Sequence, residues 1–264
     1  MTDVEAVTPI PKIVVIMPAY NASRTLEQTF REIPHDVVHE CIVVDDFSAD
    51  STVEVARKLG LRVFLHAENQ GYGGNQKTCY VEALKTRADI VVMLHPDYQY
   101  DPKKIPDLVR PIIEDRADFV LGSRMAYAVA GGMPFYKRLS NRFLTWCENK
   151  VFNLKLSEYH TGFRAFRRSI LETTPFLLNS NDFIFDQEIV AQAVWFGARL
   201  DEISVPHRYF AEASTIGFGR SVRYGLGVLA LLATFLLNRK GLMKSRMFRP
   251  LHHAYVEVQT LPPS

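Results

Sequence analysis

The sequence predicts an α/β fold: a mostly parallel sheet with flanking helices and a helical appendage near the C-terminus. Apolar stretches of strand length alternate with amphipathic helix patterns through the first half of the chain, as in βαβ units. Acidic and glycine-rich clusters follow several of these strands, which is where such sheets bind ligands. The 264 residues are 47% hydrophobic and 23% charged, so we expect one large domain with a substantial core.

Five strands and four helices are expected to alternate in this first half. The second helix has clear ends, because Ser51 or Asp50 suits an N-cap and Gly60 suits a stop. The strands are expected at 12–17, 41–45, 61–66, 89–95 and 117–123, and the helices at 23–33, 51–60, 75–86 and about 103–114.

The pattern changes after Arg124. A loop of small residues leads into a long basic amphipathic helix, and less regular segments follow. The expected elements are helices at 134–152, 182–197 and 222–237, a short strand within 157–167 and a strand at 199–206. No linker separates these segments, so we expect one domain over 1–220 and an appendage over 221–264.

The appendage suits a membrane surface. Its longest apolar run, 226–237, is well short of the roughly 20 residues that span a bilayer. Five basic residues follow the run: Arg239, Lys240, Lys244, Arg246 and Arg249. An apolar segment beside cations can lie among the headgroups of an anionic leaflet. A helix packed on the core or at a dimer interface fits the sequence equally well, so these alternatives stay open.

Charge and cysteine usage indicate the compartment. The net charge of +2 gives no reason to expect a nucleic acid partner. The three cysteines lack metal-ligand spacing and fit a reducing cytosol. Residues 1–11 are polar and do not resemble a secretory signal. We therefore expect a cytoplasmic protein, peripheral on the cytoplasmic face of a membrane, with its oligomeric state open.

Two adjacent carboxylates, Asp45 and Asp46, end the second expected strand. Helix capping accounts for Asp50, but it does not explain paired aspartates, because adjacent like charges repel unless a ligand or cation lies nearby. A carboxylate at this place can accept the N–H of a nucleobase. We therefore favour ligand binding over capping for this pair.

Two further clusters follow later strands. Asp97 and Gln99 alternate with tyrosines after the fourth strand, so they project on one side of an extended segment. A carboxylate and an amide oxygen, together with diphosphate oxygens and water, suit Mg²⁺ or Mn²⁺, although a turn rich in Pro, Asp and Tyr is an equal alternative. The sequence NQGYGGNQ at 69–76 resembles a phosphate-binding loop at a helix N-terminus, but it is weak evidence alone.

Taken in order, the motifs resemble the family 2 inverting glycosyltransferases, most closely the dolichol-phosphate (polyprenyl-phosphate) mannosyltransferase and glucosyltransferase type. The motifs are PAYN at 18–21, DD at 45–46, NQGYGG at 69–74, Asp-x-Gln at 97–99, GSR at 122–124 and TGFRAF at 161–166. This resemblance implies the GT-A fold of nucleotide-diphospho-sugar transferases, whose sheet is Rossmann-like, with the catalytic domain over 1–220. It also implies a nucleotide-sugar donor, a divalent metal ion and a lipid phosphate acceptor.

The resemblance also implies roles for individual residues. Asp97 and Gln99 match the metal-binding Asp-x-Gln, and His95 stands where the family often has a further aspartate. The residues expected to be catalytic are Asp97, Arg124 beside the acceptor, Arg208 near the diphosphate and Glu188 near the acceptor. The residues expected to bind the nucleotide are Pro18, Tyr20, Asn21, Asp45, Asp46, Asn69, Gly71 and Gly73.

The acceptor decides whether a base is needed. A lipid phosphate is already anionic, so Arg124 and the basic helix 134–152, with Lys137, Arg138 and Arg142, would hold it by charge-assisted hydrogen bonds. A hydroxyl acceptor, as in polysaccharide or glycolipid synthesis, needs a carboxylate base, for which Asp186 and Glu188 are candidates. The family's usual Ser-Lys after the late arginine is missing here, so the sugar and the geometry at the diphosphate stay open. The nucleobase, uracil or guanine, and the acceptor also stay open.

Other classes fit the sequence less well. A nucleotidyltransferase usually has a phosphate loop after its first strand, where this chain has PAYNAS. A dehydrogenase has its glycine signature after the first strand, whereas this chain has it after the third. A non-catalytic nucleotide-sugar binder, with His95 marking a degenerate site, stays open.

Overall fold

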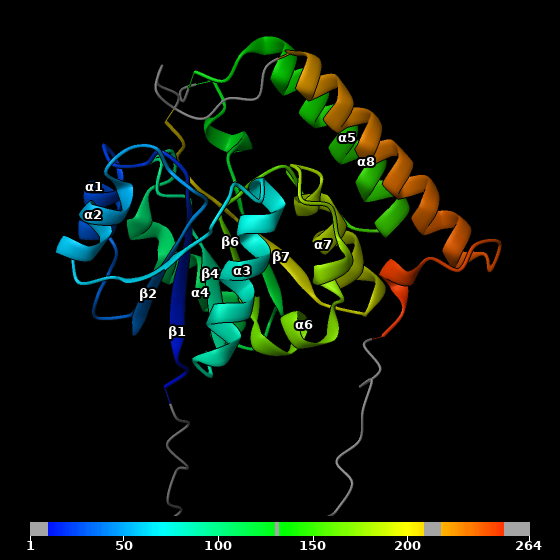
Figure 1. Ribbon diagram of the computed structural model, residues 1–264. Helices are drawn as coiled ribbons and strands as arrows, with labels where there is room; N and C mark the ends of the chain where they lie inside the picture. The colour runs from blue at the N-terminus through cyan, green and yellow to red at the C-terminus, as the bar shows by residue number, and fades with distance from the viewer. Residues whose placement is uncertain (1–9, 130–131, 209–217, 251–264) are drawn as a thin grey trace, which may run out of the picture.

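A seven-stranded mixed sheet forms the centre of the molecule in the computed structural model, which describes residues 10–129, 132–208 and 218–250 (Figure 1). The strand order is β3-β2-β1-β4-β6-β5-β7. The strands are β1 Ile13–Ala19, β2 Glu40–Asp45, β3 Arg62–Leu65, β4 Ile90–Met93, β5 Phe119–Ser123, β6 Arg164–Arg167 and β7 Leu200–Ser204.

Helices cover both faces of the sheet, and successive residues of β1 point to opposite faces. Val14 and Ile16 pack with the helices of one layer, whereas Ile13 and Val15 pack with those of the other. The first layer contains α3 Tyr72–Lys85, α5 Phe135–Phe152, α6 Arg168–Thr173, α7 Phe185–Trp195 and α8 Phe218–Arg239, and the second contains α1 Leu26–Arg31, α2 Thr52–Lys58 and α4 Ile105–Ile113.

The expected α/β architecture is confirmed, with one strand that runs the other way. β6 lies between β4 and β5 and is antiparallel to both, so the fourth and fifth expected strands are not neighbours. The remaining strand pairs are parallel. The carboxyl ends of β1, β2 and β4 therefore meet at the upper edge of the sheet in Figure 1.

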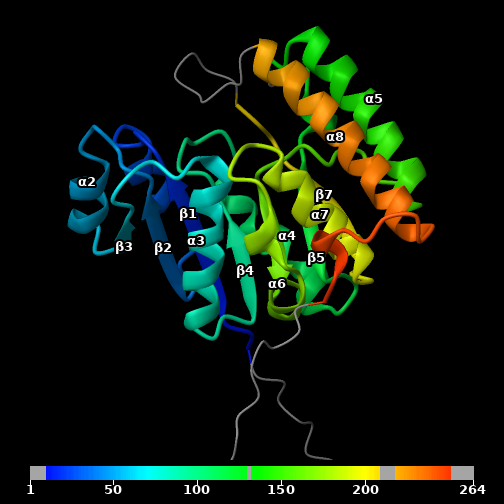
Figure 2. The same cartoon turned by 45° about the vertical axis from the view of Figure 1, so that its right-hand side comes forward.

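The last helix is longer than the sequence indicates. α8 spans 22 residues, whereas the expected helix covered 222–237. Its segment Gly219–Arg239 is long and apolar enough to cross a membrane by length and composition alone. α8 instead runs beside α5 (Figure 2), and Phe235 packs edge-on against Phe152 at 5.1 Å between ring centroids. The expected boundary at 220–221 falls within this helix and stays a prediction, and residues 251–264 of the expected tail lie outside the described residues.

Candidate functional site

The paired aspartates after β2 have different partners. Asp45 is buried, and its two carboxylate oxygens accept hydrogen bonds from the backbone N–H and the hydroxyl of Ser48, at 2.9 and 2.5 Å. Asn21, with a positive φ of 51°, binds the same turn through its N–H to Ser48 and its side-chain oxygen to the N–H of Ala49. These two residues therefore shape the turn after β2.

Asp46 holds the glycine-rich turn against the sheet edge. Its carboxylate accepts hydrogen bonds from the backbone N–H groups of Gln70 and Gly71, at 2.8 and 3.0 Å, and contacts His66 Nδ1 at 2.7 Å. The side chain of Asn69 donates to the carbonyl of Asp46 at 3.0 Å. The structure thus joins the first and third clusters, and it assigns the carboxylate of Asp46 to the protein backbone.

The first turn of α3 lies very close to the segment that precedes α7. Gly71 has a φ of 82°, and a Cβ atom there would lie 2.8 Å from the carbonyl oxygen of Asn181. A Cβ atom on Gly73 would lie 2.8 Å from that of Phe185, and the N–H of Gly73 donates to the Asn181 carbonyl at 2.8 Å. Side chains at 71 and 73 would therefore force this turn away from the helix layer.

The aromatic rim beside these clusters is exposed. Pro18 lies in β1 opposite Val44, and Tyr20 follows it with 58% of its surface exposed. Phe47, with a positive φ of 64°, is exposed to the same degree, at 57%. Two exposed rings beside the turn after β2 suit stacking on a planar nucleobase. Phe47 follows the acidic pair directly, but the acidic motif itself gives no signal for the ring.

Asp97 and Gln99 lie after β4, with Asp97 accepting the backbone N–H of Gln99 at 3.1 Å. Burial raises the pKa of Asp97, and the nearby His95 opposes this rise. Among the described residues, no three His, Cys, Asp or Glu side chains gather as metal ligands. Any ion held here would take its remaining ligands from the diphosphate and water.

The amide of Gln99 fits the role of a ligand. Its Oε1 lies 2.9 Å from Nε2 of His207, whereas its Nε2 is buried without a hydrogen-bond partner. Burial lowers the pKa of His207 to about 3, so its ring is neutral and one of its nitrogens can accept. With the amide turned by 180°, Nε2 donates to His207 and the oxygen takes the unpartnered position. The donor set of Asp97 and Gln99 therefore fits a hard divalent cation.

His95 connects the metal-site turn to the glycine-rich turn. Its Nε2 lies 3.2 Å from the hydroxyl of Tyr72, and the two rings stack with centroids 5.4 Å apart. The Tyr72 hydroxyl donates its one proton to Asp186 at 2.7 Å, so the N–H of His95 must be on Nε2. Burial lowers the pKa of His95, and the neutral ring keeps its Nδ1 lone pair for a ligand.

Arg208 lies beside the same turn. Its backbone N–H donates to the Gln99 carbonyl at 3.0 Å, and its guanidinium lies 4.6 Å from the ring centroid of Tyr98. Tyr98 in turn donates to Glu32 at 2.5 Å. The structure therefore places the backbone of Arg208 beside Gln99, with its guanidinium over Tyr98, and its expected role near a diphosphate stays a prediction.

Arg124 is held by a buried carboxylate. Glu158 accepts hydrogen bonds from the backbone N–H of Arg124 at 2.6 Å, from its guanidinium, and from Asn141 of α5 at 2.8 Å. The guanidinium also donates to the carbonyl of His160. Only 13% of the Arg124 side chain is exposed, so its guanidinium joins β5, α5 and the segment before β6.

The two candidate bases on α7 are both engaged. Asp186 accepts from Tyr72 and from Gln76, at 2.7 and 3.0 Å, and pairs with the buried Arg164 at 3.4 Å. Glu188 accepts from the backbone N–H of Ser180 at 2.7 Å, and burial raises its pKa. Glu188 therefore supports the segment that covers Gly73 and is not among the residues grouped around Asp97.

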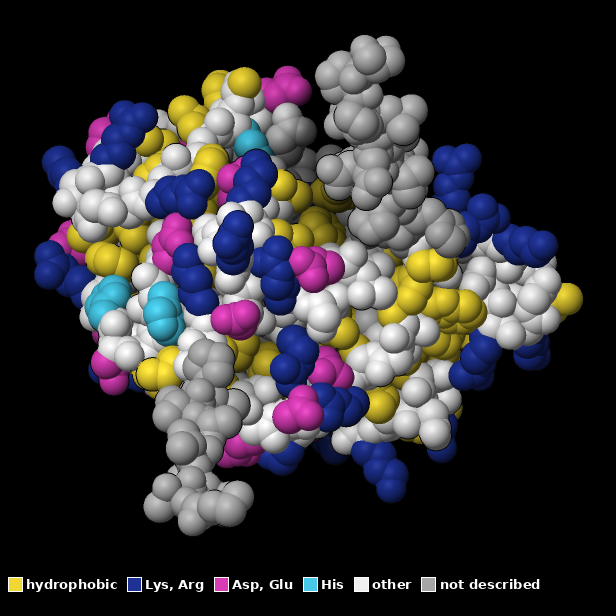
Figure 3. Space-filling model, turned by 90° about the horizontal axis from the view of Figure 1, so that it is seen from below, with side chains coloured by type: hydrophobic (Ala, Val, Ile, Leu, Met, Phe, Trp, Pro, Cys, Tyr) yellow, Lys and Arg dark blue, Asp and Glu magenta, His cyan; other side chains and the backbone are white. Residues whose placement is uncertain are grey.

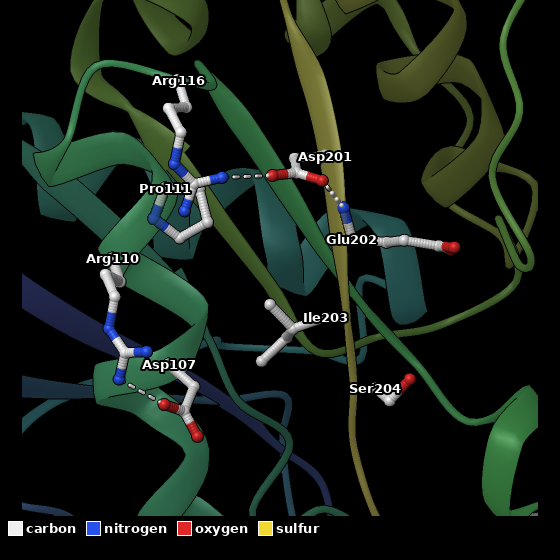
Figure 4. A pocket seen from close by; sticks show the side chains of 8 residues that line it. All are labelled: Asp107, Arg110, Pro111, Arg116, Asp201, Glu202, Ile203 and Ser204. Carbon is white, nitrogen blue, oxygen red and sulfur yellow. Dashed lines mark hydrogen bonds and ion pairs between the residues drawn. The ribbon is translucent and has the colours of Figure 1, made fainter.

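A pocket of about 400 Å³ lies elsewhere, between α4 and β7 (Figure 4). Four of its charged side chains form pairs: Arg110 contacts Asp107 at 2.5 Å, and Arg116 contacts Asp201 at 3.1 Å. None of the residues expected to bind donor or metal lines it. We therefore place the candidate site at the carboxyl ends of the strands.

Comparison with known proteins identifies the family of the chain. The family model described as glycosyl transferase family 2 matches residues 14–174, which is more than half of the chain. The chain belongs to glycosyl transferase family 2. The expected family and enzyme class are confirmed, and the matched range contains the three clusters at the sheet edge.

Archaeal relatives resemble this transferase in sequence. An uncharacterized protein of Methanocaldococcus jannaschii is 29% identical over 202 residues, covering 75% of this chain and 82% of its own. A UDP-N-acetylglucosamine–dolichyl-phosphate N-acetylglucosaminyltransferase of Methanococcus voltae is 27% identical over 178 residues, covering 61% and 71%.

Solved structures confirm the GT-A fold. Glucosyl-3-phosphoglycerate synthase from Mycobacterium tuberculosis, in complex with phosphoglyceric acid, aligns with a TM-score of 0.68 and 21% identity, covering 89% of this transferase and 82% of that chain. Another structure of that synthase contains Mn²⁺, UDP and glucosyl-3-phosphoglycerate, with a TM-score of 0.65 and 20% identity over the same shares of both chains.

Several residues of the site were missed by the sequence analysis. His66, Tyr72 and His207 each contact an expected site residue. His66 and His207 belong to no acidic or glycine motif, and Tyr72 lies within NQGYGG at a position for which no role was expected. Arg164 lies in the quoted TGFRAF motif, yet its complete burial beside Asp186 has no signal in spacing. Such contacts join segments up to about a hundred residues apart, so only the tertiary structure reveals them.

Proposed function

We propose that this transferase moves a hexose from a UDP- or GDP-linked sugar to a polyprenyl or dolichyl phosphate at a cytoplasmic membrane face, with inversion at the anomeric carbon. The observation that carries the proposal is the position of Asp97 and Gln99 after β4. The backbone of Arg208, which follows β7, meets this turn at Gln99, and the contact of His95 with Tyr72 joins it to the glycine-rich turn. The name of the Methanococcus voltae relative, which contains both a UDP-sugar and dolichyl phosphate, supports the substrate classes.

The leaving diphosphate needs positive charge. Asp97 and Gln99 would hold Mg²⁺ or Mn²⁺, with the Nδ1 of His95 as a further candidate ligand, and a bound cation would neutralise charge on the departing diphosphate. The presence of Mn²⁺ with UDP in the mycobacterial synthase supports this assignment. Arg208, held beside Gln99, stabilises the same developing charge. The bond from the anomeric carbon to the donor phosphate breaks, and its electron pair leaves with the nucleoside diphosphate.

The hydrogen-bond partners of the two carboxylates on α7 favour a phosphate acceptor over a hydroxyl acceptor. A hydroxyl must lose its proton to a base, but Asp186 accepts from two donors and pairs with Arg164, and Glu188 accepts a backbone N–H. A lipid phosphate is already an oxyanion, and it forms the new bond to the anomeric carbon without a base. Lys137 of α5 supplies a cation for it near Arg124.

A donor and acceptor panel tests the proposal. UDP- and GDP-hexoses are incubated with detergent-dispersed polyprenyl phosphate or with simple glycosides, and labelled lipid product is counted. We expect transfer to the lipid phosphate, abolished by EDTA and reduced about 10²–10³-fold in Asp97→Ala. Asp107→Ala, in the separate pocket of α4, is the control and should keep full activity. Transfer to glycosides alone, or an Asp97→Ala enzyme of undiminished rate, would contradict the proposal.

A further inference from the structure

α5 and α8 form a parallel helix pair at one side of the molecule (Figures 1 and 2). Leu144 lies near Gly225 at one end of the contact, and Phe152 packs on Phe235 further along both helices. The buried face of α8, which includes Val228 and Leu232, belongs to the same core as the sheet. Both helices begin at the edge where the parallel strands end, so the pair borders the candidate site.

The outer face of this helix pair is apolar. On α5 the exposed large side chains recur at helical spacing, and on α8 they form a second stripe opposite the buried face. Trp146 is 59% exposed and Leu226 is 63% exposed, which is unusual for side chains of this size. The outer stripe consists of Phe135, Leu139, Phe143 and Trp146 of α5 with Val222 and Leu226 of α8.

Charge is distributed very unevenly between the helix pair and the rest of the chain. Residues 134–153 and 218–249 contain eleven of the 31 Lys and Arg residues but one of the 29 Asp and Glu residues. That acid, Glu148, is buried, with its carboxylate 3.2 Å from Nε2 of His160. These two segments carry a net formal charge of +10, and the remaining residues carry −8. Seen from below (Figure 3), Lys and Arg side chains flank a hydrophobic area on the right side of the molecule.

We infer that the outer stripe of the helix pair is a membrane-docking surface that lies flat on an anionic leaflet. An apolar stripe flanked by cations and free of exposed acids matches the boundary between acyl chains and negative headgroups. The acidic remainder of the chain is repelled by the same surface, so the charge separation sets one orientation. α8 lies flat because spanning would strip Val228 and Phe235 from the core.

This docking gives the proposed function its geometry. The stripe begins at the start of α5, at the edge of the sheet that holds the candidate site, so an acceptor headgroup can reach that site from the leaflet. Access of the acceptor to the site rests on the proposed function, whereas binding of the protein to vesicles requires neither donor nor acceptor. A failure of docking is therefore distinguishable from a failure of sugar transfer.

Vesicle binding tests the inference with the full chain. Vesicles of neutral phosphatidylcholine are compared with vesicles that also contain phosphatidylglycerol, by co-sedimentation and by the emission of Trp146. We expect binding to the anionic vesicles with a blue-shifted emission that Trp146→Phe removes, and weaker binding in high salt. Because each cation near an anionic surface contributes roughly fivefold, the neutral vesicles should bind on the order of 100-fold more weakly or worse.

A variant of the stripe supplies the decisive comparison. The combined change Leu139→Ser, Phe143→Ser and Leu226→Ser should abolish sedimentation while transfer to a detergent-dispersed short-chain acceptor persists. The matched control, Leu177→Ser with Leu178→Ser, removes two exposed leucines outside the pair and should bind like the native chain. Equal sedimentation of the stripe variant would overturn the inference. The inference would also be overturned if light scattering showed the native chain to be a dimer and the stripe variant to be a monomer, because the stripe would then join two copies of the chain.

Discussion

Two parts of the sheet hold their polar groups by different means: the part around β1–β3, where we propose that the donor binds (the donor side), and the part around β5–β7, where we propose that the acceptor binds (the acceptor side). On the donor side, Asp45 and Asp46 accept backbone N–H groups from turns that follow the strands closely. On the acceptor side, Glu158 binds the side chains of Arg124 and Asn141, which come from separate elements. The donor side thus depends on how closely two backbones approach, and the acceptor side depends on buried side-chain pairs.

The largest effect on stability is expected on the acceptor side. Glu158→Ala leaves Arg124, whose side chain is 13% exposed, without its carboxylate, and breaking such a buried pair costs about 3–5 kcal/mol of unfolding free energy. Urea unfolding measures this loss. Glu27→Ala removes the exposed partner of Arg31 in α1 and should change stability far less. A loss below about 1 kcal/mol for Glu158→Ala would mean that the pair behaves like a surface ion pair.

A smaller effect is expected on the donor side. Gly73→Ala places a methyl group 2.8 Å from Cβ of Phe185, and relieving that overlap should cost about 1–3 kcal/mol of unfolding free energy. It should also weaken nucleoside diphosphate binding, because α3 begins at this turn. Calorimetric titration and urea unfolding report the two quantities. Gly219→Ala meets no atom within 4 Å and serves as the control, and a Gly73→Ala protein that binds nucleotide normally would argue against a tightly packed donor turn.

The smallest effect is expected at the opposite edge of the sheet from the candidate site, where Asp118 and Arg199 precede β5 and β7. Hydrogen bonds from Arg199 hold the pKa of Asp118 well below its ordinary value of 3.8. This pair therefore stabilises the fold above about pH 4 and loses its contribution as the pH falls below that value. Asp118→Asn should flatten the acid dependence of the melting temperature without changing nucleotide affinity. An unchanged acid profile would show that the Arg199 pair contributes nothing to folding.

The same difference explains what the sequence could predict. The strands of the donor side and the clusters at 45–46, 69–76 and 97–99 follow from local patterns, because each cluster comes directly after a strand or opens a helix. The structure gathers these clusters as expected, since carboxyl ends of parallel strands meet at one edge. Local pattern also located α5, at Phe135–Phe152.

The remainder depends on contacts between distant residues. The insertion of β6 between β4 and β5 has no local signal, because the residue pattern of a four-residue strand does not indicate whether it pairs parallel or antiparallel with its neighbours. The hydrogen bonds from two N–H groups of the glycine-rich turn to the carboxylate of Asp46 likewise have no local signal, and the expected contact of Asp46 with a nucleotide stays a prediction. The expected helix 222–237 was too short, because Gly219 and polar residues at its ends extend α8 without extending the apolar run.

The central claim is that Asp97, with Gln99, holds a divalent cation against the donor diphosphate. Calorimetric titration of UDP and GDP with and without Mn²⁺ tests it most directly, in the native chain and in Asp97→Asn. We predict that Mn²⁺ strengthens binding of one nucleotide at least about tenfold in the native chain and leaves Asp97→Asn unaffected, because a coupling of this size is about 1.4 kcal/mol. An equal effect of Mn²⁺ on both proteins would contradict the account.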